Sequence, residues 1–86
     1  MNINQLTEIL EKKILANKLI NKIEVEDKSF LHKNHKGNKE GSFHIKLKID
    51  SKELKSKNKI ESTRYIYKIL EHELRNYIHS LQIEFF

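Results

Sequence analysis

The sequence predicts an α+β sandwich, in which a small β-sheet is covered by helices on one face. Residues 23–28, 43–49 and 80–86 alternate apolar with polar side chains. Successive side chains of a strand point to opposite faces, so this period of two predicts three strands that each bury one face. Residues 2–19 and 58–78 instead carry apolar residues at helical spacing, which predicts a helix in each segment.

The first helix is expected over residues 2–19. Asn2 followed three residues later by Gln5 resembles a capping box, and Asn17 and Asn21 mark the exit from the helix. The buried stripe is expected to consist of four aliphatic residues: Leu6, Ile9, Leu10 and Ile14.

The next two strands are expected to pair antiparallel. Alternation places four apolar residues of the second strand on one face: Phe43, Ile45, Leu47 and Ile49. The polar residues between them are expected to face outward: His44, Lys46 and Lys48. Glu24 and Glu26 of the first strand then lie beside these lysines, a cross-strand complement of a few tenths of a kcal/mol per pair.

The connection between these two strands is a candidate for function. It spans twelve residues, 30–41, and it contains His32, His35 and both glycines of the chain. Hairpin loops usually take about two to five residues, and longer loops in compact domains tend to be functional or disordered.

The second half of the chain predicts a short helical turn, a long helix and a last strand. The turn covers residues 52–54, after Asp50 or Ser51, and Asn58 with Glu61 supplies a second capping signature. The long helix is expected to run for about five turns on a stripe formed by Ile60, Thr63, Tyr67, Leu70, Leu74 and Ile78, thickened by Ile66 and Tyr77. About thirty residues separate the second and third strands, which leaves room for a right-handed crossover and a parallel pairing.

Length and composition limit the class of protein. Eighty-six residues without a linker or repeat predict a single domain, 1–86. The absence of cysteine excludes disulfides, cysteine-rich zinc sites and a self-contained cysteine-ligated iron–sulfur cluster. No apolar run is long enough to span a membrane and no signal peptide is recognised, so a cytoplasmic protein without a membrane partner is expected.

Positive charge is concentrated in the middle of the chain. Residues 28–59 hold ten lysines against Glu40, Asp50 and Glu53, a net charge of +7, whereas each flanking segment carries −1. Such a field attracts phosphate backbones or an acidic partner. Four basic residues at the start of the long helix are the candidate nucleic-acid-binding residues: Lys55, Lys57, Lys59 and Arg64. Ordinary solvated lysines explain them equally well.

Four of the five histidines form a candidate metal-ligand set: His32, His35, His44 and His79. Neutral imidazole is the commonest metal ligand in proteins. The pattern alone favours a plainer interpretation, in which the loop histidines are solvated and His79 caps the last helical carbonyls. A histidine-only zinc or nickel site is a further possibility, and His72 is assigned no role.

The sequence does not predict an enzyme. It lacks a cysteine nucleophile, a GxSxG elbow and a glycine-rich phosphate loop. Acid/base pairs can be drawn from its Glu and His residues, but their spacing singles out none of them.

Together the segments resemble the BolA family over nearly the whole chain. The resemblance is carried by IEVEDKS at 23–29, the loop histidines, GSFHI at 41–45 and YIHSL at 77–81. The family's middle motif is altered at 54–67, where Arg64 and Tyr67 match but Ser56, Ser62 and Thr63 replace a glycine and an Arg-His pair.

This resemblance implies a fold similar to class II KH domains, with the order helix, strand, strand, helix, helix, strand and no GxxG loop. It also implies a non-enzymatic protein that partners a monothiol glutaredoxin in [2Fe-2S] cluster binding, trafficking or iron sensing. The cluster would be shared with glutaredoxin and glutathione, and none would be held by the protein alone. His79 and His32 are the implied ligands, with His35 and His44 as second choices.

The alternative implied function is a DNA-binding transcriptional regulator that binds duplex DNA through the basic surface. The altered residues at 54–67 weaken this alternative more than they weaken the cluster function. Without a partner, the protein is expected to be a monomer or a weak homodimer.

Overall fold

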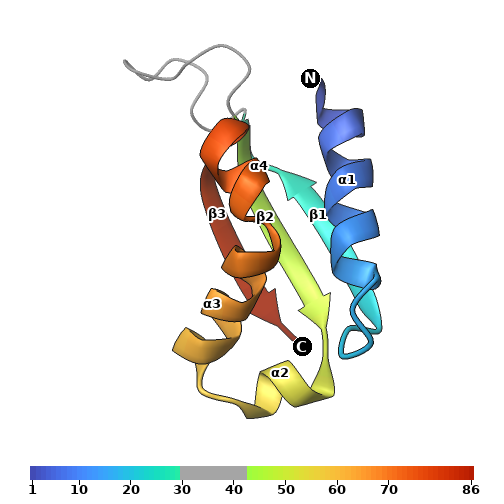
Figure 1. Cartoon of the computed structure of the whole chain (residues 1–86), viewed down its shortest axis with the longest axis vertical. Helices are drawn as coiled ribbons and strands as arrows, with labels where there is room; N and C mark the ends of the chain where they lie inside the picture. The colour runs from blue at the N-terminus through green and yellow to red at the C-terminus, as the bar shows by residue number, and fades with distance from the viewer. Residues whose placement is uncertain (30–42) are drawn as a thin grey trace.

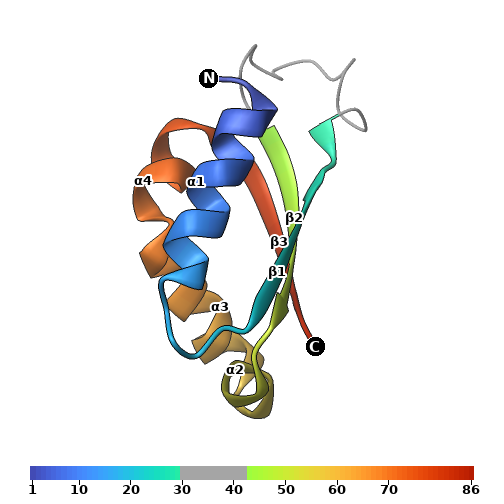
Figure 2. The same cartoon turned by 90° about the vertical axis from the view of Figure 1, so that its right-hand side faces the viewer.

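The computed structural model describes residues 1–29 and 43–86. Within them the elements are α1 (Ile3–Leu15), β1 (Lys22–Asp27), β2 (Phe43–Asp50), α2 (Lys52–Ser56), α3 (Lys59–Ile69), α4 (Glu71–Asn76) and β3 (Ile78–Phe85) (Figure 1). All of these helices lie on the same side of the sheet (Figure 2). The predicted α+β sandwich is confirmed.

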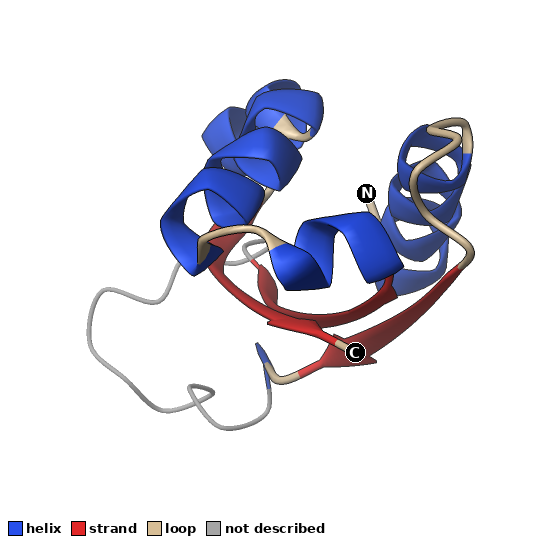
Figure 3. Ribbon diagram, turned by 90° about the horizontal axis from the view of Figure 1, so that it is seen from below, coloured by secondary structure: helices blue, strands red, loops and turns tan. Residues whose placement is uncertain are grey.

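The three strands form one mixed sheet in the order β1-β2-β3, with β2 in the centre. β1 pairs antiparallel with β2, and Val25 lies opposite Leu47. β3 pairs parallel with β2, and Ile83 lies on the other side of Leu47. Seen along the strands, the sheet curves beneath the helices (Figure 3). Both predicted pairings are confirmed.

Helix α1 begins as predicted and ends earlier than predicted. The backbone N–H of Gln5 donates to Asn2 Oδ1 at 2.9 Å and the backbone N–H of Asn2 donates to Gln5 Oε1 at 3.0 Å, which completes the capping box. The helix stops at Leu15 rather than near Leu19. Asn17 Oδ1 accepts from the backbone N–H of Leu19, so the side chain of Asn17 stabilises a turn there.

The long helix predicted over 58–78 is two helices. Leu70 adopts φ −100° and ψ 18°, outside the helical range, and separates α3 from α4 (Figure 1). The backbone N–H of Leu74 still donates to the Leu70 carbonyl at 2.8 Å, so the chain bends without losing that hydrogen bond. The helical part ends at Asn76, because Ile78 already belongs to β3.

The buried stripe of α3 and α4 also differs from the prediction. Ile60 and Tyr67 are 63% and 40% exposed. The buried residues of these helices and the connecting position are Ser62, Ile66, Leu70 and Glu73. A hydrophobicity pattern does not detect a buried Ser or Glu, because their burial depends on polar partners elsewhere in the fold.

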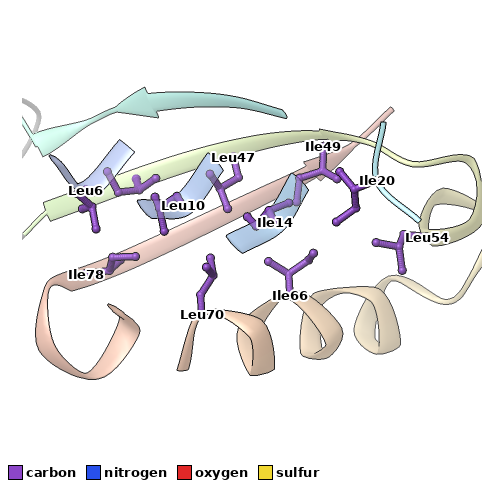
Figure 4. Close-up of a cluster of buried hydrophobic side chains, with 11 residues drawn as sticks. Leu6, Leu10, Ile14, Ile20, Leu47, Ile49, Leu54, Ile66, Leu70 and Ile78 are labelled. Atoms are coloured by element: carbon purple, nitrogen blue, oxygen red, sulfur yellow. The ribbon is translucent and has the colours of Figure 1, made fainter. Parts of the chain in front are cut away.

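The core lies between the sheet and the helices (Figure 4). Its buried apolar residues are Leu6, Leu10, Ile14, Ile20, Ile45, Leu47, Ile49, Leu54, Ile66, Leu70 and Ile78. Burying one Leu or Ile side chain is worth about 1.5–3 kcal/mol. The apolar face of β2, which alternation predicted, supplies the centre of this cluster.

Two buried serines stabilise the base of the sandwich. Ser51 Oγ donates to the Leu19 carbonyl at 2.6 Å, and it accepts from the backbone N–H of Leu54 at the start of α2. Ser62 Oγ donates to the Leu54 carbonyl at 2.6 Å and so connects α3 to α2.

No helix in residues 1–29 and 43–86 is long and apolar enough to cross a membrane.

An ion pair joins α1 to α4 across the helical layer. The carboxylate of Glu73 is almost fully buried, and both of its oxygens lie 2.8 Å from Lys13 Nζ. Lys13 itself is 40% exposed along its side chain, so one partner remains open to water.

Replacing Lys13 with Met should lower the free energy of unfolding by roughly 2–3 kcal/mol, because it leaves a buried carboxylate without its cation. The effect should be smaller than for a fully buried ion pair, because the Lys13 side chain is partly exposed. Urea unfolding measures the change. Lys12→Met on the exposed side of α1 is the matched control and should be nearly neutral. A Lys13→Met/Glu73→Met double variant should recover much of the loss, and equal effects of Lys13→Met and Lys12→Met would contradict the assignment.

Candidate functional site

The candidate site lies where β2 and β3 begin. Phe43 pairs with Ile78 but His44 pairs with Ser80, so His79 is an extra residue in the β3 strand. The Phe43 N–H donates to the Tyr77 carbonyl at 3.0 Å, which fixes the register just before the irregularity. A bulge of this kind changes the direction of the side chain at the extra position.

The bulge brings two imidazole rings together. The ring centroids of His44 and His79 are 4.9 Å apart, and the rings meet edge to face at 61°. His79 is exposed to solvent, whereas His44 is only 4% exposed. The site therefore has one accessible imidazole supported by one enclosed imidazole.

The enclosure of His44 corrects the sequence-based expectation that it looks outward beside Lys46. Its Nδ1 lies 2.7 Å from Ser80 Oγ, and its backbone N–H donates to Ser29 Oγ at 3.1 Å. Its carbonyl accepts from the N–H of Lys28 at 2.7 Å. Alternation identifies the face of a strand on which a residue lies, but not what covers that residue.

Ser80 is a residue that sequence reasoning missed. It faces His44 because of the bulge, which no signal in the sequence indicates. The hydroxyl of Ser80 can either donate to Nδ1 or accept from it, so it helps to orient the ring and to select its tautomer.

The structure places the four candidate ligands unequally. It brings together His79 and His44, while His32 and His35 lie outside the described residues. In residues 1–29 and 43–86 no group of three or more His, Asp or Glu residues is arranged to hold a metal ion. His72 is exposed on α4, where its Nδ1 and carbonyl lie near the Asn76 amide.

Three of the four candidate nucleic-acid-binding residues line one hollow. Lys55, Lys57 and Lys59 face β3 across a cavity of about 570 Å³, and Lys46 also lines it. Arg64 is not among its lining residues, although it is exposed on α3. The hollow lies beside the later residues of β3, away from His79 at the start of that strand.

The sheet face that carries no helix contains an ion-pair cluster. Glu26 lies 3.3 Å from Lys28 Nζ and 3.4 Å from Lys48 Nζ, so the predicted cross-strand pairing of Glu26 with a β2 lysine is present. Hydrogen bonds from Lys28 and then Lys48 lower the pKa of Glu26 below its ordinary value. The same carboxylate raises the pKa of Lys48.

Known proteins share the small mixed sheet with helices on one face. The family model for BolA-like proteins matches residues 10–86, and the chain belongs to this family. A search of curated proteins found no match.

Solved structures agree with this assignment. The BolA domain of SufE1 from Arabidopsis thaliana superposes with a TM-score of 0.75 at 27% identity, over 99% of this chain and 92% of that one. BolA1 from the same plant gives 0.72 at 27% identity, over 91% and 86%. A bol-like protein from Babesia bovis, at 14% identity and a TM-score of 0.66 over 91% and 79%, shares the fold.

Lys28→Ala should raise the pKa of Glu26 toward its ordinary value, because the largest hydrogen-bond contribution is removed. A carboxyl with a lowered pKa stabilises the fold above its unfolded pKa, and this contribution disappears as the pH falls through the folded value. An NMR titration of the Glu26 carboxyl carbon measures the shift. Lys22→Ala at the start of β1 is the control, and an unchanged Glu26 pKa in Lys28→Ala would show that Lys28 is not the cause of the lowered pKa.

Proposed function

We propose that this BolA-like protein is a non-enzymatic partner of a monothiol glutaredoxin and that His79 ligates a [2Fe-2S] cluster shared with that glutaredoxin and glutathione. The observation that carries the proposal is the exposed imidazole of His79 beside the enclosed imidazole of His44 at the bulge. Membership of the BolA-like family supports it.

Accessibility makes His79 the first choice as ligand. A ligand to a cluster held at the surface of another protein has to be exposed and held in a fixed position. The imidazole of His79 is exposed, and its backbone is part of strand β3. The chain has no cysteine, so thiolate ligands have to come from a partner. Histidines can replace cysteines on one iron of a two-iron cluster, which raises its reduction potential.

The second histidine of the proposal is His32, and His35 and His44 are the alternatives. His44 lies next to His79, but its Nδ1 already contacts Ser80 and its ring is buried. We therefore assign His44 the role of positioning His79 rather than that of a ligand that contacts the partner protein. His32 stays the predicted second ligand because the resemblance to the BolA family implies it, and His35 stays its alternative.

His79→Ala should remove the visible absorption and circular-dichroism signature specific to the mixed complex. The experiment mixes the protein with a monothiol glutaredoxin, glutathione, iron and sulfide, and compares the spectrum with that of glutaredoxin alone. His72→Ala is the matched control, because it removes an exposed histidine of α4 and should leave the spectrum unchanged. A wild-type spectrum from His79→Ala would reject His79 as a ligand.

The same mixture separates the remaining histidines. His32→Ala should also lose the signature, whereas His35→Ala should keep it. His44→Ala should shift the bands without abolishing them if His44 positions His79. Far-UV circular dichroism of each variant checks that the fold is intact, and loss of the signature in His35→Ala but not in His32→Ala would reassign the second ligand.

DNA binding is the second candidate function, and it is favoured by one observation. Lys55, Lys57 and Lys59 converge on the same hollow rather than scattering over the surface. Lysines that bind phosphates release counterions, so affinity for duplex DNA should fall steeply with salt.

Removing these lysines should reduce both the affinity and its salt dependence. Each phosphate that is no longer neutralised lowers the slope of log affinity against log salt by about 0.9. Fluorescence anisotropy with duplex DNA at several salt concentrations measures the slope for the wild type and for Lys55→Ala/Lys57→Ala/Lys59→Ala. Lys12→Ala/Lys18→Ala on and after α1 is the charge control. No measurable binding of the wild type at low salt would remove this candidate.

A further inference from the structure

β3 has an open edge in the part of the chain that the structure describes. The strand order is β1-β2-β3, so one side of β3 pairs with β2 and no strand of residues 1–29 or 43–86 pairs with the other. An edge strand presents a row of backbone N–H and C=O groups that can pair with another chain.

The hydrogen bonds of neighbouring residues show which groups face this edge. The Phe86 N–H donates to the Ile49 carbonyl at 2.9 Å, so the backbone of Phe86 points toward β2. Backbone groups of successive residues alternate between the two sides of a strand, so those of Phe85, Ile83 and Leu81 point outward. The Tyr67 hydroxyl donates to the Leu81 carbonyl at 3.2 Å, which confirms that the Leu81 carbonyl points away from β2.

Tyr67 blocks the edge only at Leu81. Beyond it, Ile83 and Phe85 line the hollow of about 570 Å³. The opposite wall is formed by residues of α2, of α3 and of the turn between them, at the end of the molecule where β3 also ends (Figure 1). The hollow begins at Tyr67 and Leu81 and continues along Ile83 and Phe85, whose outward backbone groups Tyr67 does not contact.

The hollow is positively charged. Four lysines line it, Lys46, Lys55, Lys57 and Lys59, against the single acidic residue Glu84. None of the ion pairs formed among residues 1–29 and 43–86 involves these lysines. Their charge is available to an acidic ligand that approaches the strand edge.

We propose that this hollow binds an extended acidic peptide segment of a partner protein, which adds to β3 as a further strand. Backbone hydrogen bonds to Ile83 and Phe85 would supply affinity, and acidic side chains beside Lys55, Lys57 and Lys59 would supply specificity. This surface is separate from the cluster site, because His79 lies at the beginning of β3 and the hollow at its end.

Two other occupants fit less well. A DNA backbone offers phosphate acceptors but no donors for the outward carbonyls of Ile83 and Phe85, and an RNA backbone offers only its 2′-hydroxyls. A second copy of this chain, paired edge to edge through β3, would bring its own lysines against the same lysine-lined hollow. Like charges placed opposite each other disfavour such a dimer.

Hydrogen exchange of single amides tests the proposal. The probe is a short capped peptide that alternates aspartate with threonine, added to the full chain. The amides of Ile83 and Phe85 should exchange at least about tenfold more slowly in its presence, while the Gln82 amide, which faces β2, should change little. Unchanged exchange at Ile83 and Phe85 under saturating peptide would overturn the proposal.

Matched peptides isolate the two sources of affinity. Two further peptides have the same sequence but carry N-methyl groups on every second residue, one on the odd-numbered and the other on the even-numbered residues. Both keep the charge, but one of them loses the N–H groups that face β3. That peptide should bind at least about tenfold more weakly. A lysine-for-aspartate peptide should not bind. Equal binding of all methylated and unmethylated peptides, or binding of the lysine peptide, would contradict strand addition by an acidic segment.

Protein variants and a competing ligand complete the test. Lys57→Glu/Lys59→Glu should weaken peptide binding at least about tenfold, whereas Lys12→Glu/Lys18→Glu, at exposed positions that do not line the hollow, should not. If duplex or single-stranded oligonucleotides bind the hollow and the peptide does not displace them, the occupant is nucleic acid and the proposal fails. Because His79 does not line the hollow, a His79→Ala variant that still binds peptide separates this result from the cluster test.

Discussion

The parallel pairing of β2 with β3 is the constraint on which the rest of this molecule depends. Parallel neighbours cannot be joined by a tight turn, so the chain has to cross the sheet between them. The crossing contains α2, α3 and α4, whose buried residues complete the core over β2. The same pairing sets the start of β3 beside the start of β2, so His79 meets His44 there.

Polar interactions inside the helical layer determine how the helices sit on that sheet. Glu73 holds α4 to Lys13 of α1, and Ser62 holds α3 to Leu54 of α2. Burying a carboxylate or hydroxyl without a partner destabilises the fold by more than the partnered group stabilises it. These interactions therefore favour the observed packing of the helices over alternative packings that would separate the partners. The buried side of α3 and α4 therefore includes Ser62 and Glu73 as well as Ile66 and Leu70.

These interactions also explain how far the sequence could predict the fold. The alternation of Ile45, Leu47 and Ile49 identified β2 and its buried face, because strand geometry converts spacing directly into direction. Helical spacing located the long helical segment but not its bend at Leu70 or its buried Ser and Glu. Those features depend on residues distant in sequence, about which local periodicity carries no information.

The candidate site was predictable only in part for the same reason. Residue type and resemblance singled out His79, but its meeting with His44 and Ser80 depends on a one-residue irregularity between two strands that lie far apart in the chain. The late position of β3 also has a consequence for biosynthesis. The second neighbour of β2 is formed by residues 78–85. In a nascent chain on the ribosome, one edge of β2 therefore stays unpaired until this segment has emerged. Chaperones that shield strand edges would act in that interval.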